Sequence, residues 1–521
     1  MFHWGGSASV SIRRSLHCPP GSGRLRTGHL LPRPFPAACL VLPLLLMTGG
    51  DVWSQVRDDF RPAVDILDYA FDLDLTHPPL LSAEATVAAL LVAPAATLTL
   101  SLQGMTVVDV RAGEEQLNFR HEESRLTVAL PSDLVPLRDT IVVRVQYRGY
   151  PSDGLLFGGD SRTCEGVFGD NWPDRARCWL PVVDHPSDKA SVTWRIRVAS
   201  GCDALANGTL TSVSSGAGGA WREFVWREQH PIPTYVMVVA VGRFMRYNLL
   251  ACGLPSAGQT GSIPHELYVL PDAGDAWPGP FCAAPAILRF YEQMIGPYPY
   301  DKLAHVQSGT RFGGMENASL IFYNNRGFRE GTIGTRLIAH EMAHQWFGDA
   351  VTIEDWPHLW LSEGFATYLT ALWIRRESGT AVFEDYLREM RAQIMTDRVV
   401  RTRPVVDTLE NHPSDLLNVN TYQKGAWVLH MLRNLTGDSV FFEGLRTFYA
   451  EYRHANASTN ASRRVMERVA GTDFSTFFDQ WLNRPGVPVW RYAWKFDPER
   501  KSVILNLEQT TESGLFSVPL D

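Results

Sequence analysis

Apolar and polar residues alternate over the first half of the chain in short stretches that turn residues separate. Such stretches run over residues 85–92, 96–102, 139–149 and 190–200, with Gly, Pro and Asp between them. A period of two buries one face of a β-strand, so they predict an antiparallel sheet. The stretch SSGAGGA at 214–220 predicts a hairpin tip or surface loop within it. We therefore expect an N-terminal β-domain over residues 55–250.

After about residue 250 the apolar residues recur at intervals of three and four. The segments 335–348, 361–378, 421–437 and 439–453 carry this pattern, which predicts helices with one buried face. Gly348, Gly379 and Gly437 stand where these helices would stop. The pattern predicts a second, mainly α-helical domain over residues 251–485.

Strand-like segments return near the end of the chain. Residues 487–496 and 502–509 flank the turn sequence DPERK, a pattern typical of a β-hairpin. We expect a short C-terminal β-tail over residues 486–521, part of a β-sandwich.

The first 54 residues differ in composition from the rest. Residues 1–50 contain five Arg and no Asp or Glu, and they include an apolar run at 37–47. This pattern predicts an export signal, and the run is too short for a helix that spans a bilayer. We expect a secreted or periplasmic protein with no stable membrane span after cleavage, or a membrane-anchored one if the leader is retained.

Charge and cysteine content exclude two classes of function. The net charge is −8, and no run of Lys or Arg could follow a phosphate backbone, so no nucleic-acid partner is expected. The cysteines beyond the leader form an odd set without CxxC spacing, which excludes a cysteine metal cluster: Cys164, Cys178, Cys202, Cys252 and Cys282. One or two pairs could form disulfides, and Cys164 and Cys178 are the closest in sequence; alternatively, the cysteines are small hydrophobic residues of the core.

The sequence HEMAH at 340–344 carries the candidate chemistry. On a helix, His340 and His344 project from one face and can bind one metal ion. Zinc suits two imidazoles and a carboxylate, and Glu363 lies 19 positions after His344 on the next predicted helix. The plainer alternative is that His340 and His344 form a polar stripe on a packed helix and bind no metal. The helix is otherwise apolar, and buried polar groups need a partner, so we expect one zinc ion per chain.

Glu341 lies beside the first ligand and is not itself needed to bind the metal. It is placed to reach an open coordination position and to take a proton from the attacking water. We therefore predict Glu341 to be the general base.

Several further segments, in a fixed order, carry a family resemblance. They are RFGGMENASLIFY at 311–323, HEMAHQWFGD at 340–349, WLSEGFATY at 360–368, TYQKGAWVLHML at 421–432 and FFDQWLNRPGVPV at 477–489. With RCWLPVVDHPSDKA at 177–190 and PIPTYVMVVAVGRF at 231–244, the chain resembles the aminopeptidase N family of gluzincin metallopeptidases over about residues 60–520. The resemblance implies a multidomain α+β protein with a thermolysin-like catalytic domain.

The resemblance also implies roles for individual residues. The GGMEN segment is expected to bind substrate through Gly313, Gly314, Met315, Glu316 and Asn317, and Glu316 to hold the free α-ammonium. Bare backbone at the two glycines lets a substrate strand lie close and pair with it. Tyr422 matches the family's catalytic Tyr, whose phenol donates to the oxyanion.

The chain departs from the family at a second amine-binding position. Family members contribute a Gln or Glu a few residues before the Arg that corresponds to Arg177; here Trp172 falls at that offset and cannot accept such a bond. Asn171 is expected to substitute, with Asp170 and Asp174 as alternatives.

These observations predict a zinc-dependent aminopeptidase that acts on peptides with a free N-terminus. Two alternatives stay open. One is an epoxide hydrolase or endopeptidase on the same scaffold; the other is a non-catalytic binding protein that retains the fold.

Overall fold

The computed structural model describes residues 10–15, 63–130, 139–158, 164, 166–252, 263–271, 279–511 and 513–518. The chain divides into two compact units, one formed by residues 61–485 and the other by residues 1–60 with 486–521. Both predicted domains over 55–250 and 251–485 fall largely within the first unit.

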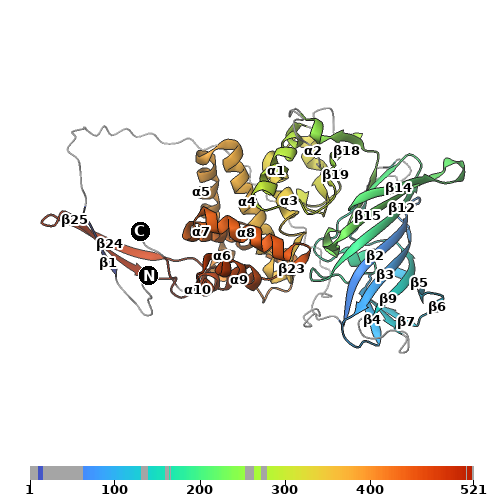
Figure 1. Ribbon diagram of the computed structural model, residues 1–521, viewed down its shortest axis with the longest axis horizontal. Coiled ribbons are helices and arrows are strands. Elements are labelled where there is room, and N and C mark those ends of the chain that lie inside the picture. The colour runs from blue at the N-terminus through green and yellow to red at the C-terminus, as the bar shows by residue number, and fades with distance from the viewer. Residues whose placement is uncertain are drawn as a thin grey trace. The chain divides into compact units, whose positions relative to one another are not determined.

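A large sheet dominates the N-terminal part of the first unit, and its strands lie side by side in Figure 1. Its order is β14-β15-β12-β2-β3-β9-β5-β6. The strands are β2 (Val64–Asp74), β3 (Leu81–Leu91), β5 (Met105–Ala112), β6 (Glu115–Gln116), β9 (Thr140–Gly149), β12 (Lys189–Ala199), β14 (Thr209–Ser215) and β15 (Trp221–Pro233). All pairs are antiparallel except β2 with β12, which run parallel. The predicted antiparallel β-domain is confirmed, and residues 216–220, within the predicted stretch 214–220, connect β14 and β15.

Two smaller sheets complete this part. One is β4-β8-β7, with β4 (Thr97–Ser101), β7 (Phe119–Glu122) and β8 (Arg125–Ala129). The other is β10-β11-β16-β13, with β10 (Leu155–Phe157), β11 (Val167–Gly169), β13 (Asp203–Ala206) and β16 (Val239–Gly242). Fully buried aromatic rings fill the interior beside the large sheet: Trp194 lies 5.0 Å from Phe71 and 5.9 Å from Trp179 between ring centroids.

The part that carries the candidate chemistry begins with a sheet that the sequence pattern did not predict. Its order is β17-β18-β19-β21-β20, with β17 (Met245–Asn248), β18 (His265–Val269), β19 (Leu303–Ser308), β20 (Gly314–Met315) and β21 (Leu320–Asn324). β18, β19 and β21 pair in parallel, and every residue of β18 and β19 is buried. Strands buried on both faces show no alternation, so their sequence carries no period of two.

The four predicted helices are confirmed, and others join them. The helices are α1 (Ala284–Met294), α2 (Asn325–Glu330), α3 (Thr335–His344), α4 (Trp360–Ser378), α5 (Thr380–Thr396), α6 (Arg398–Thr402), α7 (Gly425–Thr436), α8 (Asp438–Tyr452), α9 (Thr459–Ala470) and α10 (Ser475–Phe478). This helical part also contains two π-helical turns, Asn420–Lys424 and Asp479–Asn483. It is completed by a strand pair, β22 (Val351–Ile353) and β23 (Ala455–Ala457). α4 and α7 end before Gly379 and Gly437 as predicted, whereas α3 ends at His344.

The second unit contains the predicted C-terminal hairpin. β24 (Trp490–Asp497) and β25 (Ser502–Gln509) pair antiparallel, and β1 (Val10–Ser15) pairs with the other edge of β25. The apolar run at 37–47, on which the export signal depends, lies outside the described residues.

Two disulfides join cysteines that sequence proximity did not pair. Cys164 bonds to Cys202 and Cys252 to Cys282, while Cys178, the closest neighbour of Cys164 in sequence, is a buried free thiol. Pairing of β11 and β13 with the same strand, β16, accompanies a distance of 5.5 Å between the Cα atoms of Cys164 and Cys202, which local sequence does not set. Among the described residues, no helix is long and apolar enough to cross a membrane.

Candidate active site

α3 and α4 bring the predicted metal ligands together. The Nε2 atoms of His340 and His344 lie 3.1 Å apart, and Oε2 of Glu363 lies 3.3 Å from each. Ligand bonds of about 2.0–2.2 Å in a tetrahedral site place ligand atoms about 3.3–3.5 Å from one another. The three atoms therefore fit around one zinc ion.

Neighbouring groups orient these three side chains. Nδ1 of His344 lies 2.9 Å from Oγ of Ser362, and Tyr422 donates a 2.8 Å hydrogen bond to Oε1 of Glu363. The other oxygen of this carboxylate, Oε2, has no hydrogen-bond partner among the described residues although it is buried. An oriented carboxylate with one oxygen kept for an ion is the arrangement that a metal site needs.

Two further buried carboxylates adjoin the ligands. The side chains of Glu316, Glu341 and His344 place ligand atoms within 4.8 Å of one another. A Cβ at residue 314 would lie 2.2 Å from Oε1 of Glu341, so only glycine lets the GGMEN segment pass the Glu341 carboxylate. Gly314 is therefore required here by close approach.

Burial and crowding perturb the titration of these groups. Burial raises the pKa of Glu341 well above its ordinary value, and it also raises the pKa of Glu316. Burial opposes the charge of His344, but the neighbouring carboxylates, led by Glu363, raise its pKa to about 10. A divalent ion bound to the imidazole nitrogens would displace the proton of His344.

The site carries more negative charge than one metal ion can balance. Glu316, Glu341 and Glu363 are each less than 10% exposed, and two neutral imidazoles add no charge. A divalent ion leaves one carboxylate charge, and buried charges require a partner. A proton on one carboxyl group, which the raised pKa of Glu341 favours, or one monovalent cation beside the metal would complete the balance.

Gln345 couples the metal-binding helix to the segment that carries Glu316. Its side-chain amide donates to the Glu316 carbonyl at 2.6 Å and to Oδ2 of Asp349 at 2.8 Å. Its oxygen accepts from the Ser319 backbone N–H at 2.8 Å and from the Tyr298 hydroxyl at 3.1 Å. Every hydrogen-bonding position of this fully buried amide is used, which fixes the Glu316 backbone relative to α3.

A π-helical turn places Tyr422 in the site. Its ring stacks on His340, with centroids 6.1 Å apart, and its hydroxyl reaches Glu363. The turn is held by Asn420, whose amide donates to the carbonyls of Arg403 at 2.9 Å and Pro404 at 3.1 Å. Single π-turns recur at functional sites, where they change the direction of a side chain.

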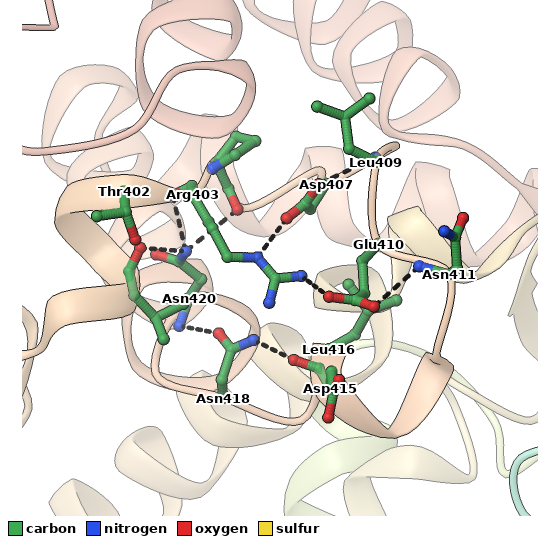
Figure 2. Close-up of polar contacts among 12 residues, drawn as sticks. Thr402, Arg403, Asp407, Leu409, Glu410, Asn411, Asp415, Leu416, Asn418 and Asn420 are labelled. Carbon is green, nitrogen blue, oxygen red and sulfur yellow. Dashed lines mark hydrogen bonds and ion pairs between the residues drawn. The ribbon is translucent and has the colours of Figure 1, made fainter. Parts of the chain in front are cut away.

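An ion-pair network stabilises the loop that leads into this turn. Figure 2 shows the Arg403 guanidinium directed at Asp407 and Glu410. It donates to Oδ2 of Asp407 at 2.5 Å and to Oε2 of Glu410 at 2.6 Å. Asn418 extends the network: its oxygen accepts from the Asn420 backbone N–H, and its amide donates to the Asp415 carbonyl (Figure 2). The network thereby supports the π-turn of Tyr422.

The three metal ligands, Glu341, Glu316 and Tyr422 line one pocket. The lining residues are Trp172, Phe312, Gly314, Met315, Glu316, His340, Glu341, His344, Glu363, Leu417 and Tyr422. All predicted metal and catalytic residues are in this set, as are Gly314, Met315 and Glu316. Gly313, Asn317 and Asn171 are not.

The position of Asn171 corrects the expectation that it binds the substrate amine. Its buried amide donates to the carbonyls of Thr234 and Met237 and accepts from Nε1 of Trp179, so its polar atoms are used inside the β-domain. The two alternatives, Asp170 and Asp174, form ion pairs with arginines and also lie outside the pocket lining.

Sequence reasoning missed three lining residues. Trp172 takes the place that a polar residue was expected to fill, and Phe312 directly precedes GGMEN, so both lay beside motifs that were recognised. Leu417 belongs to the loop before the π-turn, and no sequence signal marks it.

Comparisons with known proteins agree with this geometry. Residues 282–481 match the peptidase family M1 domain. Aminopeptidase M1-D of Oryza sativa subsp. japonica is 27% identical over 473 residues, which cover 84% of this chain and 52% of that protein. Leucyl aminopeptidase of Saccharolobus solfataricus is 25% identical over 453 residues, which cover 81% of this chain and 54% of that protein. The chain thus spans about half the length of these curated relatives.

A solved structure extends the similarity to the fold. A mutant M1 zinc metallopeptidase from Deinococcus radiodurans, bound to a Tyr-Ser-Ala substrate, has 25% sequence identity and a TM-score of 0.72. The match covers 82% of this chain and 96% of that one.

Proposed function

Because the chain belongs to the aminopeptidase N family of M1 gluzincins, we propose that it is a zinc-dependent aminopeptidase that hydrolyses the N-terminal bond of peptides. The observation that carries the proposal is the buried carboxylate of Glu316 beside the metal ligands. A peptide's α-ammonium is the monovalent cation that would balance it.

His340, His344 and Glu363 would hold the zinc. When bound, zinc lowers the pKa of water and polarises the substrate carbonyl. Glu341 adjoins the ligands within the pocket. Its carboxylate takes a proton from the attacking water and delivers it to the leaving amine. Burial raises the pKa of Glu341, which suits a group that must hold that proton between the two steps.

Substrate binding follows from the GGMEN segment and Tyr422. β20 is an edge strand, so Gly314 and Met315 offer unpaired backbone groups to an extended peptide. Glu316, the next residue, is then placed at the peptide's N-terminal end. The Tyr422 hydroxyl donates to Glu363 in the absence of substrate, and it would turn its one proton to the oxyanion that forms at the scissile carbonyl.

Blocking the substrate amine tests the proposal. An aminoacyl anilide with a free amine should be cleaved with kcat/KM at least about tenfold above that of its N-acetylated form, since an ammonium about 4 Å from a buried carboxylate is strongly attracted. A chelator should abolish both activities, and added zinc should restore them. Equal cleavage of both anilides would indicate an endopeptidase. No cleavage of any anilide by zinc-loaded protein would contradict peptidase function.

We also propose that the protein is exported. The arginine-rich leader with its apolar run at 37–47 supports this, as do two disulfides, since such bonds persist in oxidising compartments. After expression in a fractionated host, the mature chain is expected in the periplasm or medium, with an N-terminus beyond residue 47 by N-terminal sequencing. Membrane retention with the leader attached would indicate the anchored form, and a cytosolic chain with reduced cysteines would contradict export.

A further inference from the structure

A four-residue turn carries Glu316. Residues 316–319 connect the antiparallel strands β20 and β21, and the Leu320 N–H closes the turn on the Asn317 carbonyl at 2.9 Å. Ser319, the last residue of the turn, has a φ of 61°, which a residue with a side chain holds only where its surroundings fix it. The place of the Glu316 carboxylate therefore depends on the contacts that fix this turn.

The peptide group between Ala318 and Ser319 is held from two sides. Its N–H donates to Oε1 of Gln345, which directly follows the metal ligand His344, at 2.8 Å. Its carbonyl accepts from the side-chain amide of Asn207, a residue of the β-domain, at 2.6 Å. Both amide side chains are fully buried, so rotating this peptide group would leave buried polar groups without partners.

Three consecutive residues of the β-domain, 206–208, bond to the catalytic part at the turn from β13 to β14. The carbonyl of the first accepts from Nζ of Lys302 at 2.6 Å. The second is Asn207, and the N–H of the third, Gly208, donates to Oγ of Ser319 at 2.8 Å. Two of the three bonds therefore reach the turn that carries the substrate-binding carboxylate.

The β-domain turn is itself rigid. The Asn207 amide also donates to the Val236 carbonyl at 2.9 Å, and its oxygen accepts from the Val238 N–H at 2.6 Å. Gly208 has a φ of 78°, and a Cβ there would collide with the Arg227 carbonyl, so only glycine permits the turn. Because the amide is fixed within the β-domain, its remaining N–H has one direction, toward the catalytic part.

Resting on the proposed aminopeptidase function, we propose that Asn207 is a positioning residue for Glu316. It lies outside the pocket lining and acts through the Ala318–Ser319 peptide group. The β-domain thereby sets the place of the carboxylate that holds the α-ammonium, and with it the discrimination between free and blocked amines. A displacement of about 1 Å can cost about a hundredfold in rate, but Gln345 still holds the Glu316 carbonyl when Asn207 is lost, so a loss of about tenfold is expected.

The aminoacyl anilide that the native protein cleaves best, and the N-acetyl form of the same compound, test the positioning role. Asn207→Ala should lower kcat/KM for the free-amine substrate about tenfold, chiefly through KM, because the ammonium loses a well-placed partner. For the N-acetyl form kcat/KM should stay unchanged, since that substrate has no ammonium. Ser319→Ala, which removes only the acceptor of the Gly208 N–H, should shift the ratio of the two in the same direction and serves if the first variant does not fold.

Asn456→Ala is the matched control. The Asn456 amide donates to the Pro186 carbonyl in the β-domain at 2.8 Å and to the Ile353 carbonyl in the catalytic part at 3.0 Å. This variant loses the same kind of bonds between the same two parts, but none to the turn at 316–319. It should lower Tm, as Asn207→Ala should, and leave the ratio of free-amine to N-acetyl cleavage unchanged.

A binding measurement separates positioning from turnover. The amide of the same amino acid, with a free or an acetylated amine, is titrated calorimetrically into zinc-loaded Glu341→Gln protein. Adding Asn207→Ala should raise the Kd of the free-amine amide about tenfold and leave the Kd of the acetylated amide unchanged.

The outcomes distinguish the two proposals. An unchanged ratio and Kd in folded, zinc-loaded Asn207→Ala and Ser319→Ala proteins overturns the positioning role and leaves the aminopeptidase intact. An equal loss for both substrates in Asn207→Ala, matching that of Asn456→Ala, overturns it as well, because the role is then only structural. If the native protein cleaves no anilide or shows no preference for the free amine, the proposed function fails and this inference fails with it.

Discussion

Replacing Glu341 with glutamine is expected to lower kcat/KM about a thousandfold or more while zinc stays bound, because general base catalysis contributes about 10²–10⁴-fold. Glutamine preserves the size of the side chain but cannot accept the proton of the attacking water. Glu341 is not among the three residues that fit around the ion, so metal content should remain one zinc per chain. Anilide kinetics and elemental analysis of the same protein measure the two effects.

Glu384→Gln is the matched control for this substitution, because Glu384 lies exposed on α5. It should change neither zinc content nor turnover. If Glu341→Gln lost its zinc, the residue would act through the metal site, and if it kept full activity, the assignment of the base would be wrong.

Replacing Tyr422 with phenylalanine is expected to lower kcat about a hundredfold, since removing one donor to an oxyanion costs about 10²–10³-fold. The phenol donates to Glu363 at 2.8 Å, so some loosening of that ligand is also expected. Binding of a free amino acid should change little because Tyr422 acts on the scissile carbonyl. A kcat loss with a nearly constant KM is the signature, and a loss confined to KM would contradict the role.

Asn420 offers a way to test how the π-turn supports Tyr422. Asn420→Ala removes donors to the carbonyls of Arg403 and Pro404 and should reproduce part of the kcat loss while the phenol remains present. It should also lower Tm, because two part-buried carbonyls lose their partner. Asn411→Ala, exposed in the loop shown in Figure 2, is the control and should affect neither quantity.

The sequence predicted elements whose apolar residues recur with a period and missed strands that are buried on both faces. α3, α4, α7 and α8 were predicted because apolar residues recur at three and four positions, a period that the helix itself sets. β18 and β19 were missed because they are buried on both faces and show no period. The disulfide between Cys164 and Cys202 was missed because it depends on how strands pair far along the chain.

The sequence by itself determined the groups whose geometry is local. The spacing of His340 and His344 is one helical turn, so any helix there brings their rings together, and Glu341 comes with them. The position of Glu363 on the next predicted helix added the third metal ligand, and the family motifs added Glu316 and Tyr422 by their order along the chain. Predicting these residues from helix geometry and motif order required no knowledge of packing.

Only the tertiary structure decided which of the residues near the recognised motifs line the pocket. Asn171 and Trp172 are adjacent in sequence, yet the first bonds inside the β-domain and the second lines the pocket. The amide of Gln345 and the carboxylate of Asp170 act between segments far apart in the chain. The direction of such a side chain depends on long-range packing and on which buried polar groups must be satisfied, and local sequence does not encode either.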